Sequence, residues 1–260
     1  MTVVLQSFHD APPAWIKTCL ASVRAWAAGA GFSYRFENDS FFERLPDRLR
    51  AKTAARPMIA ADLARLHWLD AVTREEARPA IWLDADVLVC EPEGLTAALD
   101  LSAGYLLGRE AWVQPDRRGR PKVYRGVHNA LYAAAPGNAF VPFHIDAATR
   151  ILDRHDGPAM VPQLIGPKLL GALDNMIGLP ATPAVNMASP LLLAGLATGG
   201  KPGDIPGGGP ALDAFRAAVP VWPAAFNLCQ SYRGRDADGV VIDDALMDRA
   251  VAALRPGSSV

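Results

Sequence analysis

The fold of this 260-residue chain is decided by one stretch, Ala80-Ile81-Trp82-Leu83-Asp84-Ala85-Asp86-Val87-Leu88-Val89. Its apolar residues are typical of a buried strand, and two carboxylates stand inside it. Because successive strand side chains point to opposite faces, we expect Asp84 and Asp86 on one face, roughly 6–7 Å apart along the backbone. Ionised groups partly removed from water are costly unless a positive charge compensates them, and the stretch holds no Lys or Arg. A divalent cation, Mg²⁺ or Mn²⁺, shared with the phosphates of a substrate is the simplest compensator.

The same two carboxylates also fit a solvated turn. Asp favours turns because its side chain competes for backbone hydrogen bonds, so the strand would then end at Leu83. The apolar residues that resume at Val87 favour a strand that continues through the carboxylates.

Strands and helices alternate on the N-terminal side of this stretch. The hydrophobic spacing predicts strands over residues 3–8, 32–36 and 80–89, and helices over residues 12–26 and 58–72. This alternation predicts an α/β fold, a Rossmann-like and mostly parallel central sheet flanked by helices. Ligands of such sheets collect beyond the carboxyl ends of the strands, which is where Asp84 and Asp86 fall.

The C-terminal half is less regular. It is predicted to form strands at 103–108, 127–134 and 240–242, and helices at 138–153, 166–177 and 243–254. A polar and basic segment, 114–122, is expected to be a loop. Residues 199–210 hold six Gly and three Pro, which excludes regular structure there and favours a disordered connection over a mobile lid.

Composition limits the function classes. Half of the residues are hydrophobic and the net charge is −1, which fits one globular domain and argues against nucleic-acid binding. Three widely spaced cysteines, Cys19, Cys90 and Cys229, suggest neither a disulfide framework nor a zinc site. No run of about eighteen apolar residues predicts a transmembrane segment, and residues 1–8 do not read as a signal peptide. We therefore expect a cytoplasmic protein, with peripheral association at a membrane left open.

Asp62 and Arg65 stand three residues apart on the predicted helix 58–72, so they share one face. A surface ion pair would explain them equally well. Their neighbours are largely apolar, however, which indicates partial burial. A guanidinium held there would reach a phosphate or a sugar hydroxyl in fork geometry.

The two motifs together carry a resemblance to a known family. Ala60-Ala61-Asp62-Leu63-Ala64-Arg65-Leu66, followed by the paired aspartates, resembles the signature of glycosyltransferases with the GT-A fold. More narrowly, it resembles the family with a DXD-containing sugar-binding region, which includes Golgi initiating mannosyltransferases and capsular polysaccharide transferases. Residues 4–8, 129–132 and 166–167 resemble other blocks of that family. The resemblance implies a single GT-A-like domain over residues 1–260, with a nucleotide-sugar-binding half at 1–110 and an acceptor-side half at 111–260.

The resemblance also implies roles for individual residues. Asp86 would ligate the metal, and Asp84 would contact sugar or ribose hydroxyls and support the metal through water. Many such enzymes carry a further C-terminal ligand, often His, and no His follows His155 here. The metal ligand that replaces this His would be Asn227, or else Gln230 or Ser231. Polar residues before a glycine are, however, often only a turn.

Substrate contacts follow in the same way. The residues expected to bind the donor are Gln6, Ser7, Asp62, Arg65, Asp84 and Asn129, and the catalytic residues are Asp84, Asp86 and Arg65. The implied reaction moves a sugar, with retention of configuration, from a UDP- or GDP-sugar to a saccharide or other hydroxyl acceptor. A cation and an arginine would stabilise the charge that develops on the departing diphosphate.

Two other interpretations stay open at the level of sequence. A phosphohydrolase of the haloacid-dehalogenase type also places an Asp-x-Asp pair after a buried strand, and Asp243-Asp244 resembles its later acidic pair. The second is a sugar-nucleotide-binding module without catalysis. The histidines form no metal-ligand spacing; His67, on the helix of Asp62, is expected to be packed, and His128, beside Asn129, is the one histidine that we single out.

Overall fold

A computed structural model describes residues 1–155, 160–199 and 208–255 of the chain. Its main element is a six-stranded sheet in the order β2-β1-β3-β6-β5-β7. The strands are β1 (Val3–Ser7), β2 (Ser33–Glu37), β3 (Ala80–Leu83), β5 (Tyr105–Pro115), β6 (Pro121–Ala134) and β7 (Ala181–Thr182). β1 pairs in parallel with β2 and β3, and β5 pairs in parallel with β7, whereas β6 runs antiparallel to both β3 and β5. The predicted α/β fold, a mostly parallel central sheet consistent with a GT-A-like fold, is confirmed.

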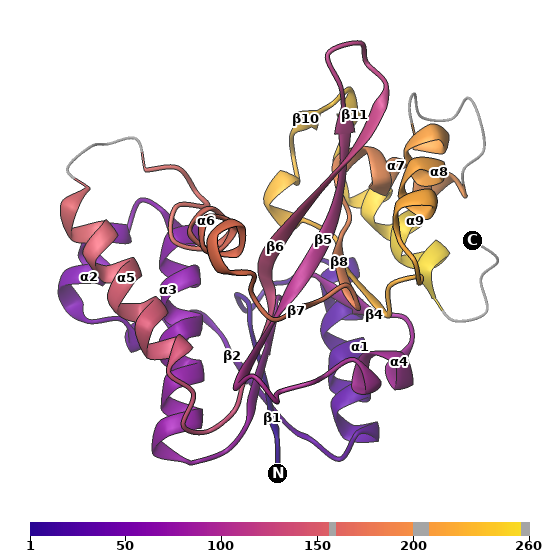
Figure 1. Cartoon of the computed structure of the whole chain (residues 1–260). Helices are drawn as coiled ribbons and strands as arrows, with labels where there is room; N and C mark the ends of the chain where they lie inside the picture. The colour runs from indigo at the N-terminus through magenta and orange to yellow at the C-terminus, as the bar shows by residue number, and fades with distance from the viewer. Residues whose placement is uncertain (156–159, 200–207, 256–260) are drawn as a thin grey trace.

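Helices cover both faces of this sheet (Figure 1). α2, α3 and α5 lie on one side, and α1 and α4 on the other. The helices are α1 (Ala14–Gly29), α2 (Asp47–Thr53), α3 (Pro57–Asp70), α4 (Pro92–Ala97), α5 (Phe140–Arg154), α6 (Pro167–Ile177), α7 (Pro190–Thr198), α8 (Gly208–Ala218) and α9 (Asp244–Leu254). Short turns of helix complete the described chain: η1 (Asp39–Arg44), η2 (Ala71–Glu75) and η3 (Gln230–Tyr232).

A second, three-stranded sheet joins β4 from the first half of the chain to two strands from the second half. Its order is β4-β9-β8, formed by β4 (Val87–Val89), β9 (Ala225–Asn227) and β8 (Val185–Met187). It joins the core that α7, α8 and α9 build, since residues of β4, β9 and these helices share one apolar cluster. A small hairpin of β10 (Asp236–Ala237) and β11 (Val240–Val241) completes the sheets of the described residues.

The stretch 80–89 differs from its prediction. β3 ends at Leu83, residues 84–86 turn, and β4 begins at Val87 in the other sheet. Both strands are fully buried, so the apolar run is genuine, but the two halves pair with different partners: β3 with β1 and β6, β4 with β9. The expectation of one continuous strand with both aspartates on one face is therefore wrong. The alternative is right that the strand ends at Leu83 and that a turn follows, but it is wrong that the turn is solvated, because Asp86 is only 8% exposed.

The helix predicted at 58–72 is α3, which begins one residue earlier because Pro57 suits the first helical position. Ten of its residues are buried, including Asp62 and Arg65, and a helix that is apolar all round lies inside the protein. α9 starts as predicted, since the Asp243 carboxylate accepts from the backbone N–H of Leu246 at 2.7 Å.

The segment predicted as a basic loop, 114–122, is largely the end of a hairpin. β5 and β6 continue their pairing to Pro115 opposite Pro121, and only residues 116–120 turn. Period-two alternation is weak here, because Trp112 and Tyr124 lie on the exposed face and Arg125 on the packed face, so the sequence pattern missed this extension. Of the predicted irregular segment 199–210, residues 200–207 lie outside the described part of the chain, and 208–210 begin α8. Among the described residues, no helix has the length and apolar character that crossing a membrane requires.

Candidate active site

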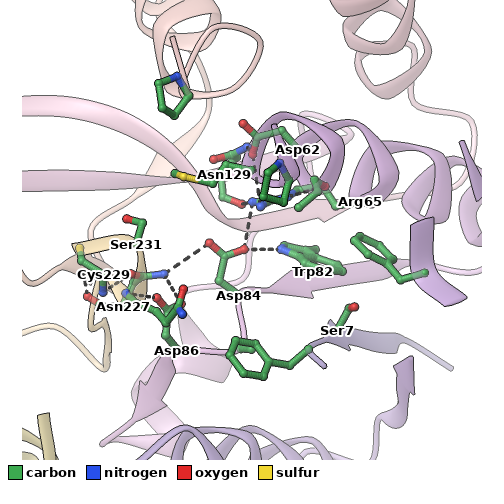
Figure 2. Close-up of a pocket in the computed structure, with 18 of the residues that line it drawn as sticks. Ser7, Asp62, Arg65, Trp82, Asp84, Asp86, Asn129, Asn227, Cys229 and Ser231 are labelled. Atoms are coloured by element: carbon green, nitrogen blue, oxygen red, sulfur yellow. Dashed lines mark hydrogen bonds and ion pairs between the residues drawn. The ribbon is translucent and has the colours of Figure 1, made fainter. Parts of the chain in front are cut away.

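A cleft of about 520 Å³ opens where the two sheets meet. It is lined by residues from the end of β1, from η1, α3, β3 and β6, from the start of α6, and from the segment after β9. Figure 2 shows Asp84 and Asp86 on its wall, with Arg65 and Asp62 beyond Asp84 and Asn227 beside both carboxylates. The predicted residues that line it are Ser7, Asp62, Arg65, Asp84, Asp86, Asn129 and Asn227.

The backbone of Asp84 is fixed by the first sheet. Its N–H donates to the carbonyl of Ala130 at 3.0 Å, and its own carbonyl accepts from Nε2 of Gln6 at 3.0 Å. The Tyr34 hydroxyl donates to the other end of the Gln6 amide at 3.0 Å. Gln6 is fully buried and does not line the cleft, so the structure places it as a support for Asp84 and not beside a substrate.

The Asp84 side chain belongs to a charged cluster on the cleft wall. Its Oδ1 lies 3.0 Å from Arg65 Nη1 and accepts from Trp82 Nε1 at 2.6 Å. Arg65 Nη2 reaches Asp62 Oδ1 at 3.2 Å, and Arg65 Nη1 also donates to the carbonyl of Asn129 at 2.8 Å. The guanidinium stands over the Trp82 ring, 5.1 Å from its centroid. One cation is therefore shared by two carboxylates.

Burial sets the charge state of Asp62. Loss of solvation, helped by the nearby charge of Asp84, outweighs the opposing effects of Arg65 and of the hydrogen bond from Asn129, and the net result is that the pKa of Asp62 is raised to about 6. Asn129 Nδ2 donates to Asp62 Oδ1 at 2.8 Å. The predicted pair on α3 is thus a buried part of the cleft wall and not a surface ion pair.

Asp86 is held by the segment after β9. Its Oδ1 accepts from Asn227 Nδ2 at 2.7 Å and its Oδ2 from the backbone N–H of Gln230 at 2.7 Å. Asn227 Nδ2 also lies 3.4 Å from Asp84 Oδ2, so one amide group bridges the two carboxylates. Desolvation, and then the charge of Asp84, raise the pKa of Asp86 to about 7.

A tight turn orients these donors. Asn227 Oδ1 accepts from the backbone N–H of Cys229 at 2.8 Å, the side-chain turn that Asn favours. Cys229 takes a left-handed conformation, φ 54°, which is unfavourable for a residue with a Cβ. The surrounding contacts hold this conformation, and it delivers the Gln230 N–H to Asp86.

The donor set fits a hard divalent cation that is completed by a ligand. Two carboxylates facing one cleft are the ligands that Mg²⁺ and Mn²⁺ take. No group of three or more His, Cys, Asp or Glu side chains among the residues described here could hold a metal ion by itself. Phosphate oxygens and water would have to supply the other ligands, as is usual for Mg²⁺ in nucleotide sites.

Asn227 contacts both carboxylates through its nitrogen and not its oxygen. The Cys229 N–H fixes this orientation, because a donor must face the amide oxygen. Ligation of a cation by Asn227 would require its amide to turn over, and it stays a prediction. Gln230, which the sequence offered as an alternative through its side chain, contributes its backbone N–H instead.

His128 lies behind the cleft wall. Its Nε2 pairs with the carbonyl of Val185 at 3.0 Å, and its Nδ1 accepts from the N–H of Ala130 at 3.2 Å. Burial lowers the pKa of His128 to about 4, so the ring is neutral near pH 7. It supports the strand that carries Asn129 and does not line the cleft.

Sequence patterns missed the roles of two residues: Trp82, which lines the cleft, and Gly166, which packs against Asp62 and Asn129. Trp82 precedes Asp84 by two residues, a spacing that could have indicated its contact with the carboxylate. Gly166 packs so closely that a Cβ there would lie 2.6 Å from Asp62 Oδ2 and 2.9 Å from Asn129 Nδ2. This glycine lies in a segment that the resemblance had marked, but only the tertiary structure reveals why no side chain fits.

Comparisons with known proteins give remote likenesses to solved structures. No protein-family model matches the chain, and no curated protein sequence matches it. Among solved structures, the chain is similar to the crystal structure of a glycosyltransferase involved in the glycosylation of the major capsid of PBCV-1. The identity is 10%, the match covers 88% of this chain and 94% of that chain, and the TM-score is 0.44. A likeness at this level assigns no activity, so function is inferred from the cleft.

Proposed function

We propose that this protein is a metal-dependent glycosyltransferase, which moves a hexose from a nucleoside-diphosphate sugar to a hydroxyl of an acceptor. The observation that carries the proposal is the convergence of Asp84, Asp86 and Arg65 on one cleft. The resemblance of the two motifs to the DXD-containing sugar-binding family supports the same activity, and it supports retention of configuration.

Each part of the cleft has a chemical role in that reaction. Asp84 and Asp86 would hold Mn²⁺ or Mg²⁺, which supplies positive charge to the diphosphate. Arg65 stands 3.0 Å from Asp84, where its guanidinium adds a fixed cation beside the developing negative charge. Asp62 and Asn129, joined at 2.8 Å, present polar groups suited to sugar hydroxyls.

Other lining residues suit the nucleoside. Ser7 lies at the end of β1, and Phe8, Phe41 and Met58 add apolar surface to the cleft. Flat apolar walls with a few polar groups are typical of sites for a nucleobase or another planar ligand.

The phosphohydrolase alternative is not favoured by the contacts of its second acidic pair. Asp243 caps α9, and Asp244 pairs with Arg233 at 2.6 Å and accepts from Trp15 at 3.0 Å. Neither aspartate lines the cleft. Asp243-Asp244 therefore resembles the later acidic pair of a phosphohydrolase only in sequence, since Asp243 caps a helix and Asp244 forms a surface ion pair.

Thermal unfolding with and without ligand tests the proposal. A ligand at about 100 times its dissociation constant stabilises the folded state by about 2.7 kcal/mol. For a chain of this size that corresponds to a rise in melting temperature of roughly 5–10 °C. We expect this rise with UDP- or GDP-sugars only when Mn²⁺ or Mg²⁺ is present, and its loss in Asp84→Ala and Asp86→Ala.

The control variant is Asp146→Ala, which removes a side chain that is 59% exposed on α5, outside the cleft. It should keep the cation-dependent rise. A rise that persists in both cleft variants would refute the proposal. Release of free sugar or its transfer to an added acceptor, measured in the same samples, separates an enzyme from a module that only binds.

A further inference from the structure

The β5–β6 hairpin has one face that is committed to the core. Ala111, Val113 and Val123 pack into the apolar cluster built by α7, α8 and α9. Arg125 lies on the same face, since it pairs with Ala111 and its Nη2 donates to the carbonyl of Ala218 at the end of α8 at 2.7 Å. In Figure 1 the hairpin extends well beyond the other strands of the sheet, and its packed face contacts these helices.

The opposite face of the hairpin carries aromatic and polar side chains. Trp112 lies directly across from Tyr124, and Gln114 directly across from Lys122, so these four share one face, called here the hairpin face. The Lys122 ammonium stands 4.8 Å from the centroid of the Tyr124 ring, and Tyr124 is 39% exposed. The hairpin face is therefore a row of rings with a cation at its outer end.

The inner end of the hairpin face adjoins the cleft. The Trp112 ring lies 5.9 Å from the ring of Tyr232, which belongs to η3. Gln230 and Ser231 of the same turn line the cleft. Glu110 comes next along the strand, packed over Gly126, where a Cβ would lie 2.8 Å from its Oε1. A continuous surface thus runs outward from the cleft for about 17 Å, the length of five strand residues.

The outer end of the hairpin is strongly cationic. Arg117, Arg118, Arg120 and Lys122 are exposed. Asp116 is used locally, since its Oδ1 accepts from the backbone N–H groups of Arg118 and Arg120 at 2.8 and 2.9 Å. Residues 114–125 hold five cations and one carboxylate, a net charge of +4, so the rest of a chain with net charge −1 carries −5. An anionic ligand is thereby attracted to the hairpin and repelled elsewhere.

We propose that the hairpin face binds an anionic saccharide and presents it to the cleft as the acceptor. The inference rests on the proposed glycosyltransferase function and names the substrate class of the same site. The flat rings of Trp112 and Tyr124 offer apolar area on which the C–H faces of sugar rings pack. The guanidinium groups and the Lys122 ammonium pair with carboxylate or sulfate groups of the chain.

Two other ligands fit the hairpin less well. A tip that enters a membrane carries Trp, Phe or Leu, and residues 116–120 here are Asp, Arg, Arg, Gly and Arg. The rings lie back along the strands, toward the cleft. A single-stranded nucleic acid usually binds along a basic groove that follows its backbone, whereas the clustered cations here are confined to residues 117–125.

Isothermal titration of the full chain tests the inference, with a galacturonate oligomer as the anionic probe and a maltose oligomer of equal length as the neutral one. We expect the galacturonate oligomer to bind more tightly. The double variant Arg118→Ala with Lys122→Ala, and separately Tyr124→Ala, should each weaken it about tenfold or more. The matched control, Lys17→Ala with Arg249→Ala, removes two exposed cations from α1 and α9 and should change binding less than about twofold.

Three outcomes would overturn the inference: equal binding of the two oligomers, equal weakening by the control pair, or hairpin-dependent binding confined to phosphatidylserine vesicles or single-stranded DNA. Cation-dependent stabilisation by a nucleotide sugar is measured on the same variants and should survive in all of them. Its absence in the unmodified chain contradicts the proposed function itself. Its presence without hairpin-dependent saccharide binding contradicts the acceptor assignment alone.

Discussion

Replacing Asp86 with Asn should stabilise the folded protein more at high pH than at low pH. Desolvation and the neighbouring Asp84 raise the pKa of Asp86 from 3.8 to about 7. Since the folded-state pKa exceeds the unfolded value, the folded chain binds more protons between these two pH values, and its stability falls as pH rises through them. Asn does not titrate, so Asp86→Asn removes this loss.

The size of the effect follows from the pKa. Each pKa unit corresponds to about 1.36 kcal/mol, so ionising Asp86 in the folded chain costs about 4 kcal/mol above pH 7. Between about pH 5 and pH 8 the pH-dependent part is about 3 kcal/mol. The hydrogen bonds lost from Asn227 and Gln230 shift stability similarly at both pH values, and the comparison between them cancels that contribution.

Urea unfolding of both proteins at about pH 5 and pH 8, without divalent cations, measures this difference. The free energy of unfolding of Asp86→Asn minus that of the unmodified chain should rise by about 2–3 kcal/mol from the lower to the higher pH. Asp146→Asn, at an exposed site on α5, serves as the control. The same difference at both pH values, or one that shrinks as pH rises, would refute the assignment of a buried, unneutralised carboxylate.

Three further substitutions test the cluster around the cleft. Gly166→Ala places a Cβ 2.6 Å from the Asp62 Oδ2 atom and should abolish nucleotide-sugar binding in the thermal assay. The control is Gly171→Ala, whose added Cβ meets no atom within 4 Å; it should keep binding and add about 0.5–1 kcal/mol of stability. Arg65→Met leaves two carboxylates without their cation and should lower the free energy of unfolding in urea by about 3–5 kcal/mol. The control, Arg35→Met, removes an arginine whose side chain is 37% exposed in its ion pair, and it should lower that free energy by less than about 1 kcal/mol. Asn227→Asp replaces the bridging amide with a third carboxylate; it should lower the melting temperature near pH 8 and strengthen stabilisation by Mn²⁺, and an unchanged Mn²⁺ titration would argue against a cation between the aspartates.

The sequence predicted the N-terminal half of the fold well because its pattern is strong there. Buried strands and an apolar helix alternate, and local hydrophobic spacing reports them directly. At Asp84 the sequence left open a continuous strand or a turn after Leu83, and it could not decide between them, since β4 pairs with β9, a strand more than a hundred residues later. Local pattern cannot distinguish one buried strand from two that enter different sheets.

The sequence predicted most of the residues that line the cleft, but it did not predict how they contact one another. Asp62 and Arg65 were recognisable as a helix pair, but their contact with Asp84 depends on the packing of α3 against β3. The family resemblance implied that Gln6 lies beside a ligand, whereas its burial makes it a support for the Asp84 backbone. The sequence also could not predict that Arg65 compensates the charge of Asp84, because the two residues lie far apart in the sequence and meet only in the folded chain.

The partners of Asp86 have a consequence for synthesis of the chain. The two groups that hold its carboxylate come 141 and 144 residues later. A nascent polypeptide folds from its N-terminus, so β1, β2 and β3 can assemble on the ribosome long before Asn227 has been translated. The cleft can be completed only after Asn227 and Gln230 have been translated, and a truncated product that stops before β9 would lack both groups that hold the Asp86 carboxylate.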